Sequence, residues 1–387
     1  MKTPLSRASL TSRYQQHCHM HASRASERAS EREPPRVTQK KMPSPPPPPP
    51  RQFAPVPPPY TLNEALSYSL FAAAARGGLN LSHESDAIRH AFRPARLQHW
   101  LTQRAPSYSK ARPFPHTVID GLLPEWILTA LSAKLPEIYR PIKRGDRYSG
   151  CTRIAGDGNP NYCIYLKDRE EKKSALDRES AMPPLAVMIF RALKSIEFTQ
   201  FLHKLSGLEP VRSLIADPMY NGSGVHFVGP EGKLGLHADF NTYRGYGLER
   251  RVNTFLFLNH DWPDRFGGHL EFWNRNLTRC EQRLRPAWNR FVVFSTTDYS
   301  WHGHPQRMEF LPQNRMRRSL ALYYYTRGRP IDECKDRVCG GHHGTIFVAP
   351  KTCRECLSKA CKAFPTNRST VSRSAWLEHG GSLRGSD

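Results

Sequence analysis

The sequence predicts a mainly β domain with flanking helices, built as a sandwich or jelly roll. Short apolar segments with strand-type alternation recur between residues 224 and 326, and turn signals such as Asn221-Gly222 separate them. Helical periodicity is confined to stretches that precede this region. Hydrophobic residues make up 38% of the 387-residue chain, which is enough for the core of one domain of roughly 200 residues or more.

The first 59 residues are expected to form a disordered tail. Residues 1–41 are rich in Ser and Arg and have no acidic residue before Glu27, a composition that also resembles an organellar transit peptide. The proline-rich run PSPPPPPPRQFAPVPPPY follows and is expected to be a polyproline II spacer. It is a candidate ligand for an SH3-like or WW-like domain, with a passive linker as the favoured interpretation.

The composition favours some cellular compartments and some classes of partner over others. No apolar run approaches the roughly 18 residues of a membrane span, and none follows the first methionine as in a secretory signal. The nine cysteines are odd in number and scattered, which favours a reducing, intracellular compartment, with organellar targeting as the alternative. The net charge of +23 favours acidic partners, but no nucleic-acid reader motif occurs, so nucleic acid is not an expected partner.

Residues 60–112 are expected to form a helical N-terminal segment. Thr61 and Glu64 fit a capping box ahead of an apolar run that Gly77-Gly78 ends. A second amphipathic stretch covers about 85–103, with a kink or a break at Pro94.

Residues 113–330 are expected to form the main domain, with about seven strands. A strand at 116–120 leads into a helix with Pro124 at its first position, and another helix is expected over about 185–205. The other candidate strands are 224–228, 233–239, 252–259, 268–274, 290–296 and 318–326.

Three side chains of this domain form a candidate metal site. His237 and Asp239 lie two residues apart on an expected strand, so both side chains point to the same face. His302 follows an apolar strand and a turn, with His304 as a rival ligand. Two imidazoles and one carboxylate on one face of a metal are typical of non-haem Fe(II) oxygenases, which keep the remaining positions open.

A cationic anchor is expected at the start of the last main strand. Arg317 and Ser319 lie on a small, partly polar face of that strand, whereas Arg318 lies on the apolar face. A guanidinium binds a carboxylate through two parallel hydrogen bonds, which suits the far carboxylate of a metal-chelating dicarboxylate. We assign Arg317 to that carboxylate, with the Ser319 hydroxyl as a second donor. A shift of one residue in register would exchange Arg317 for Arg318.

Together these segments resemble the Fe(II)- and 2-oxoglutarate-dependent dioxygenase superfamily, and within it the prolyl 4-hydroxylase-like branch. The resemblance rests on five segments in the family's order: PFPHTVIDGLLP, GKLGLHADFN, RRVNTFLFLNHDWPDRFGGHLEFW, NRFVVFSTTDYSWHGHP and RRSLALYYYT. They cover about residues 113–330. The resemblance implies a double-stranded β-helix, which is a distorted jelly roll flanked by helices.

The resemblance also implies a hydroxylase. Such an enzyme uses O2 and 2-oxoglutarate to hydroxylate a C–H bond, and it releases succinate and CO2. The substrate is unidentified, with a prolyl or other protein side chain and a small molecule as candidates, and ascorbate is a candidate cofactor besides Fe(2+) and 2-oxoglutarate. The implied iron ligands are His237, Asp239 and His302, and the implied cosubstrate ligands are Arg317, Ser319 and Asn253.

Two positions where prolyl hydroxylases often place tyrosine are Phe227 and Phe257 in this chain. Phenylalanine cannot donate a hydrogen bond to a carboxylate, so cosubstrate binding is expected to depend more on the other groups. Gly267-Gly268 is expected to permit close backbone approach near the rim of the site, with a structural β-bulge as the alternative.

Two further function classes stay open. The net charge favours an oxidative demethylase that acts on nucleic acid, although the segment resemblance does not. A catalytically silent jelly-roll binding module is the other alternative, and the complete triad with Arg317 argues against it.

Residues 331–387 are expected to form a Cys-rich, basic extension. Its Cys and His residues have a density that suits a structural zinc site, although their spacing fits no standard finger, and free thiols are the alternative. These residues are Cys334, Cys339, His342, His343, Cys353, Cys356 and Cys361. The run at 344–347 is expected to be a final strand of the domain.

Overall fold

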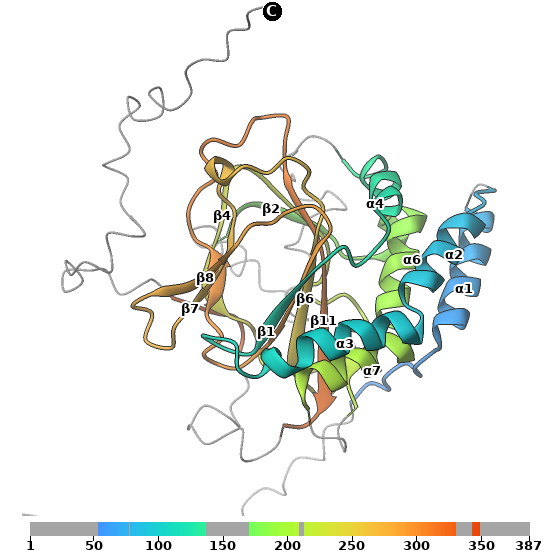
Figure 1. Ribbon diagram of the computed structural model, residues 1–387, viewed down its shortest axis with the longest axis horizontal. Coiled ribbons are helices and arrows are strands. Elements are labelled where there is room, and N and C mark those ends of the chain that lie inside the picture. The colour runs from blue at the N-terminus through green and yellow to red at the C-terminus, as the bar shows by residue number, and fades with distance from the viewer. Residues whose placement is uncertain (1–52, 77, 137–169, 209–212, 330–342, 349–387) are drawn as a thin grey trace, which may run out of the picture. The chain divides into compact units, whose positions relative to one another are not determined.

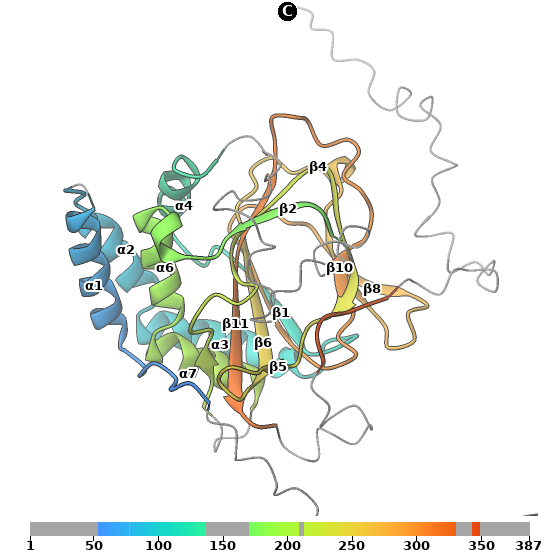
Figure 2. The ribbon, with the colours of Figure 1, turned by 180° about the vertical axis from the view of Figure 1, so that it is seen from behind.

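The computed structural model describes residues 53–76, 78–136, 170–208, 213–329 and 343–348. These residues lie in one compact unit that spans 52–387. Figure 1 shows a curled sheet with helices along one side of it, and Figure 2 shows the same arrangement from behind. Most of the expected disordered tail lies outside the described residues. So do most of the polyproline run and every cysteine of the candidate zinc site.

Within the described residues the sheet has twelve strands, and all of their pairings are antiparallel. Its main path runs through β1 (His116–Asp120), β9 (Arg290–Ser295), β6 (Leu248–Phe257), β11 (Arg317–Arg327), β4 (Gly224–Ala238), β10 (His302–His304), β7 (Leu270–Trp273) and β8 (Cys280–Leu284). Side pairings add β2 (Glu170–Leu176) and β12 (Ile346–Phe347) to β4, β3 (Ile215–Ala216) to β11, and β5 (Thr242–Tyr243) to β6.

The long strand β4 belongs to both halves of this sheet. Its first part pairs with β11, and its last part pairs with β10. A strand shared in this way makes the sheet curl back over itself, which is the double-stranded β-helix form of the jelly roll. The predicted fold class is therefore confirmed.

A bulge separates the two parts of β4. Val228 lies opposite Lys173 of β2, whereas Lys233 lies opposite Glu171, so β4 carries extra residues between these two pairs. Glu231, within the bulge, has a positive φ of 60°. Extra residues in a strand break the regular alternation of its side chains. The number of residues between two positions on opposite sides of the bulge therefore does not tell whether their side chains share a face.

The helices pack against the sheet on one side, as Figures 1 and 2 show. They are α1 (Leu62–Ala75), α2 (Ser82–Ala91), α3 (Pro94–Tyr108), α4 (Glu125–Ser132), α6 (Pro184–Leu193) and α7 (Ile196–Ser206). One apolar core joins them to residues of β4, β6, β9 and β11, including Leu256, Leu320 and Tyr324. The Tyr324 hydroxyl also donates to the Leu193 carbonyl at 2.8 Å. The helical layer thus holds the outer face of the sheet in place, while the inner face is left for the site.

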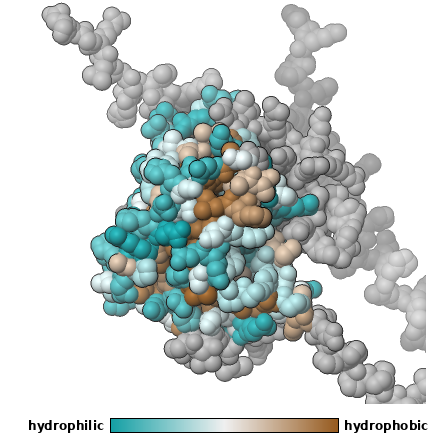
Figure 3. Space-filling model, turned by 90° about the vertical axis from the view of Figure 1, so that its right-hand side faces the viewer, coloured by the Kyte–Doolittle hydropathy of each residue, from teal (hydrophilic) through white to brown (hydrophobic). Residues whose placement is uncertain are grey.

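Figure 3 faces the helical side and shows a mainly hydrophilic surface with a smaller apolar area. Phe71 of α1 is the most exposed large apolar side chain in the described ranges, at 75%. No helix in those ranges is long and apolar enough to cross a membrane.

Several expected elements are confirmed. The capping box of Thr61 and Glu64 starts α1, and Pro94 separates α2 from α3. The strand at 116–120 is β1, and the last expected strand is found at Ile346–Phe347.

Other expected elements are wrong in detail. The helix expected over about 185–205 is two helices, because the Ser195 side chain accepts a hydrogen bond from the Phe198 N–H and caps α7. Pro124 is the N-cap of α4 and not its first residue. The candidates 224–228 and 233–239 are one bulged strand. The count of seven strands is too low, because β2, β3, β5, β8 and β10 are short or polar and lack an apolar alternation.

Candidate metal and cosubstrate site

The predicted triad comes together where β10 lies beside the end of β4. His302 pairs directly with His237 across these strands. The three side chains each offer a ligand atom, and these atoms lie within 4.8 Å of one another. Asp239 Oδ1 is 3.6 Å from His237 Nε2, and Asp239 Oδ2 is 3.3 Å from His302 Nε2. The structure therefore brings together the two imidazoles and the carboxylate that could hold a divalent metal.

Backbone carbonyls set the orientation of both histidines. His237 Nδ1 lies 2.9 Å from the Gly235 carbonyl oxygen, and His302 Nδ1 lies 2.8 Å from that of Ser300. A carbonyl only accepts, so each Nδ1 carries the hydrogen and each Nε2 keeps its lone pair. Burial, then the charge of His237, lowers the pKa of His302 to about 4, so this ring is neutral at pH 7. Neutral imidazoles with Nε2 free are the form that binds a metal.

A buried arginine that the sequence did not reveal holds the carboxylate of the triad. Arg250 is 1% exposed, and its Nη2 lies 3.2 Å from Asp239 Oδ2. Burial alone raises the pKa of Asp239, but the charge of Arg250, together with the neighbouring His302 and His237, outweighs it and holds that pKa well below its usual value. The carboxylate is therefore ionised in the absence of any metal.

Asn253 ties this pair together. Its Nδ2 donates to Asp239 Oδ2 at 2.7 Å, and its Oδ1 accepts from Arg250 Nε at 2.8 Å. The sequence predicted Asn253 as a ligand of 2-oxoglutarate, whereas the structure places its amide on Asp239. One N–H of the amide is not used by these bonds, so contact with the cosubstrate stays a prediction.

A bulge in β6 explains why Arg250 was missed. Tyr324 lies opposite Val252, but the next residue of β11, Tyr325, lies opposite Arg250. Arg251 is the extra residue, and it turns Arg250 onto the face that carries Asn253. In an unbroken strand, residues three apart point to opposite faces. The alternation of side chains along a regular strand therefore could not assign Arg250 to the site. The one sequence feature that points to it is the pair of arginines, Arg250 and Arg251, before the expected strand.

Arg317 is buried on the inner face, as the sequence predicted. It is 7% exposed, its Nε donates to the Gly268 carbonyl at 2.7 Å, and its guanidinium carbon lies 4.8 Å from the centre of the Phe257 ring. Burial lowers its pKa to about 9, and within the described ranges no carboxylate forms an ion pair with it. A buried guanidinium without an anion is costly, so the position suits an anionic ligand. Arg318, in contrast, reaches the Ser132 carbonyl in the helical layer.

Gly268 permits this placement of Arg317. It has a positive φ of 67°, and a Cβ there would lie 3.0 Å from Arg317 Cδ and 2.5 Å from the Met308 sulfur. At Gly268 it is the side chains of Met308 and Arg317 that approach the backbone closely, whereas the sequence predicted a close approach of backbones.

More polar side chains share the inner face with Arg317. Ser319 lies opposite His226 of β4, so the two side chains stand on one face. Ser319 is 1% exposed and His226 is 5% exposed. Phe227, at a position where prolyl hydroxylases often place tyrosine, belongs to the core shared with the helices, and its neighbour His226 takes the inner face.

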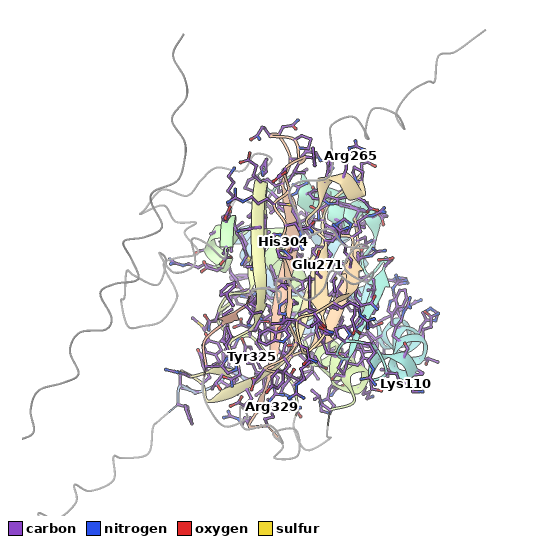
Figure 4. All side chains as sticks on the ribbon, turned by 90° about the vertical axis from the view of Figure 1, so that its left-hand side faces the viewer. Lys110, Arg265, Glu271, His304, Tyr325 and Arg329 are labelled. Carbon is purple, nitrogen blue, oxygen red and sulfur yellow. The ribbon has the colours of Figure 1, made fainter. Side chains whose placement is uncertain are left out.

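His304 completes the set. It is 3% exposed, and neither of its ring nitrogens has a hydrogen-bond partner within the described ranges. Leaving a buried polar atom unpaired costs roughly 1–3 kcal/mol. The charges that act on His304 are those of Arg317, Lys173 and His237, and burial is the larger cause of its lowered pKa. Figure 4 labels His304 among the strands of the sheet, and His304 lies opposite Leu234 of β4.

These residues fit a ferrous ion and 2-oxoglutarate. His237, His302 and Asp239 offer the donor set of a facial triad, and Arg317 and His304 are buried polar groups that lack an anion. That set of donors can orient a 2-oxo acid whose near end reaches a metal and whose far carboxylate reaches a cation.

Comparison with known proteins agrees with this description. Residues 223–325 match the model of the 2OG-Fe(II) oxygenase superfamily. No curated protein sequence matches the chain. Similar solved structures include a Trichoplax adhaerens prolyl hydroxylase in complex with a hypoxia inducible factor peptide fragment (12% identity, 60% of this chain and 91% of that chain, TM-score 0.41). A Pseudomonas putida prolyl-4-hydroxylase is also similar (18% identity, 59% and 100%, TM-score 0.34).

Proposed function

We propose that this chain, whose residues 223–325 match the model of the 2OG-Fe(II) oxygenase superfamily, hydroxylates a C–H bond of a protein side chain, with prolyl residues as the first candidates. One observation carries the catalytic part of this proposal: the His237, Asp239 and His302 ligand atoms lie together on the inner face of a sheet that also holds the buried Arg317. The choice of a prolyl substrate is supported by the segments at 113–330 that resemble the prolyl 4-hydroxylase-like branch.

The chain's own residues have separable tasks in this reaction. His237, Asp239 and His302 would hold Fe(II), and Arg317 would hold the far carboxylate of 2-oxoglutarate through its two Nη groups. Bound Fe(II) supplies the site at which O2 and the 2-oxo acid react, with succinate and CO2 as coproducts. Arg250 and Asn253 keep Asp239 ionised and oriented. Burial of these groups excludes water, which strengthens each charge–charge contact.

Mass spectrometry of candidate peptides tests this function. Proline-containing peptides are incubated with full-length protein, ferrous iron, ascorbate and 2-oxoglutarate, and the expected product carries one added oxygen atom. His237→Ala should abolish the product, whereas His90→Ala, a matched change at an exposed position on α2, should retain it. A product that forms equally with His237→Ala would contradict the proposal.

The same assay separates the alternatives. Methylated oligonucleotides replace the peptides in a second arm, and formaldehyde release there with no peptide product would identify a nucleic-acid demethylase. Absence of 2-oxoglutarate turnover with any substrate would favour the catalytically silent binding module.

A further inference from the structure

We propose that the His304 imidazole donates a hydrogen bond to the distal carboxylate of 2-oxoglutarate, beside the Arg317 guanidinium, and so makes the site selective for a 2-oxo acid with a second carboxylate. The inference rests on the proposed function, because it assigns a role within the same site. It concerns a buried residue to which neither the metal triad nor the Arg317 anchor assigns a role.

The first argument is the state of the ring. His304 is 3% exposed, and both of its ring nitrogens lack a partner among the residues that the structure describes. His237 and His302 differ in this respect, since each bonds a backbone carbonyl through Nδ1. A neutral imidazole carries one donor and one acceptor, and buried donors are nearly always paired in folded proteins. The N–H of His304 therefore has no acceptor within the described residues, and a bound ligand can supply one.

The second argument is location. His304 follows His302 by two residues on β10, and the register shift between them puts the extra residue in β4, so the spacing along β10 is that of two residues on one side of a strand. His304 is not one of the three residues whose ligand atoms cluster within 4.8 Å, so it is not a fourth member of the triad. Three charged or titratable side chains act on it: Arg317, His237 and Lys173, of which Lys173 is paired with Glu170. Arg317 is buried and has no carboxylate partner among the described residues, so a ligand anion beside Arg317 and His304 is favoured.

The third argument is the number of donors next to Arg317. Phe257 lies beneath the guanidinium at 4.8 Å and offers no donor. The Nε of Arg317 is already used by the Gly268 carbonyl, which leaves its Nη groups for a ligand. A carboxylate has two oxygens and accepts about four hydrogen bonds, whereas a bidentate guanidinium directs two N–H bonds at it. The His304 N–H is a donor from the facing half of the sheet.

Equilibrium binding tests this role without turnover. Full-length protein is loaded with Co2+ in place of iron, under nitrogen, and titrated calorimetrically with 2-oxoglutarate or with 2-oxopentanoate. The second acid has the same 2-oxo acid end but no distal carboxylate. The variants are His304→Leu, His304→Gln, which keeps an N–H donor, and the matched control His203→Leu. His203 lies on α7 and also has a buried, unpartnered Nδ1, but it is in the helical layer.

We expect His304→Leu to weaken 2-oxoglutarate binding about 10- to 100-fold, the usual range for a hydrogen bond to a charged group. Binding of 2-oxopentanoate and the Co2+ absorption spectrum should stay as in the wild type. His304→Gln should recover most of the 2-oxoglutarate affinity, and His203→Leu should change neither acid.

Three outcomes would overturn the inference: unchanged 2-oxoglutarate affinity in His304→Leu, equal weakening of both acids, or loss of Co2+. If His304→Leu does not fold, His304→Gln decides the question by comparison with the wild type, since equal weakening of both acids in that variant also overturns the inference. A wild-type protein that binds Co2+ and neither acid would instead contradict the proposed function itself.

Discussion

Asp239 forms an ion pair with one buried cation. Arg250 is buried against it at 3.2 Å and stacks over the Tyr323 ring at 3.5 Å. Removing one partner of a buried ion pair leaves the other charge unpaired, which typically costs about 3–5 kcal/mol. The metal-free Arg250→Met variant should lose stability on that scale, and its affinity for Co2+ should fall about 10- to 100-fold.

Urea unfolding and Co2+ titration check this prediction. Arg244→Met is the matched control, because Arg244 is exposed in the loop between β5 and β6. If Arg250→Met is no less stable than Arg244→Met and binds Co2+ as tightly, Arg250 does not hold the carboxylate.

Buried histidines make the stability of the metal-free protein depend on pH. Burial is the largest cause that lowers the pKa of His226, His302 and His304, and that of His302 falls to about 4. Below a pH of about 6.5 these histidines bind protons in the unfolded chain but stay neutral in the folded protein. The free energy of unfolding therefore falls as the pH drops from about 6.5 to 4. Each such histidine contributes up to about 1.4 kcal/mol per pH unit.

Other buried groups act in the opposite direction, so the test uses a difference between two proteins. Burial raises the pKa of Glu271, which makes its own contribution to stability fall as pH rises. The loss of stability between about pH 6.5 and 4.5 should be smaller in His304→Leu than in the wild type by up to about 1.4 kcal/mol per pH unit. Urea unfolding at several pH values measures this, and parallel curves for the two proteins would refute a neutral, buried His304.

At the scale of elements, the turn before β7 sets the position of Arg317. Gly268 has a positive φ, and a Cβ on it would meet the Met308 sulfur and the Arg317 stem. Gly268→Ala should therefore shift the guanidinium, weaken 2-oxoglutarate binding about 10-fold or more, and cost roughly 1–3 kcal/mol of stability. Gly245→Ala is the control, because nothing lies within 4 Å of a Cβ there.

Calorimetric titration of the Co2+-loaded variants, with thermal unfolding alongside, separates these two effects. If Gly268→Ala binds 2-oxoglutarate as tightly as Gly245→Ala does, the turn does not position Arg317.

The strand bulges mark the limit of what the sequence could predict. The His237 and Asp239 pair was predictable, because two residues on a strand need only regular alternation to share a face. Arg317 and Ser319 were predictable for the same reason. His226 and Arg250 were not, because extra residues in β4 and β6 reverse the alternation of side chains. The bulges place a histidine and an arginine in the site that a regular strand would turn away from it.

At the scale of the whole molecule, the sequence predicted which segments form strands better than it predicted how those strands are ordered in the sheet. Apolar strands such as β6, β9 and β11 were recognisable, because both of their faces are buried. The pairing of His302 with His237 joins segments far apart in the chain, and only the curl of the sheet brings them together. The resemblance of five segments to a known superfamily supplied that order, which alternation and turn signals alone could not.

The central claim is that the three clustered ligands and the buried guanidinium form one working site in the folded protein. The most direct measurement is ferrous-dependent succinate release from 2-oxoglutarate, compared between the wild type, His237→Ala and His90→Ala. We predict release by the wild type and His90→Ala that a chelator abolishes, and none above background by His237→Ala. Equal release by all three proteins, or none by the wild type with any offered peptide, would contradict the account.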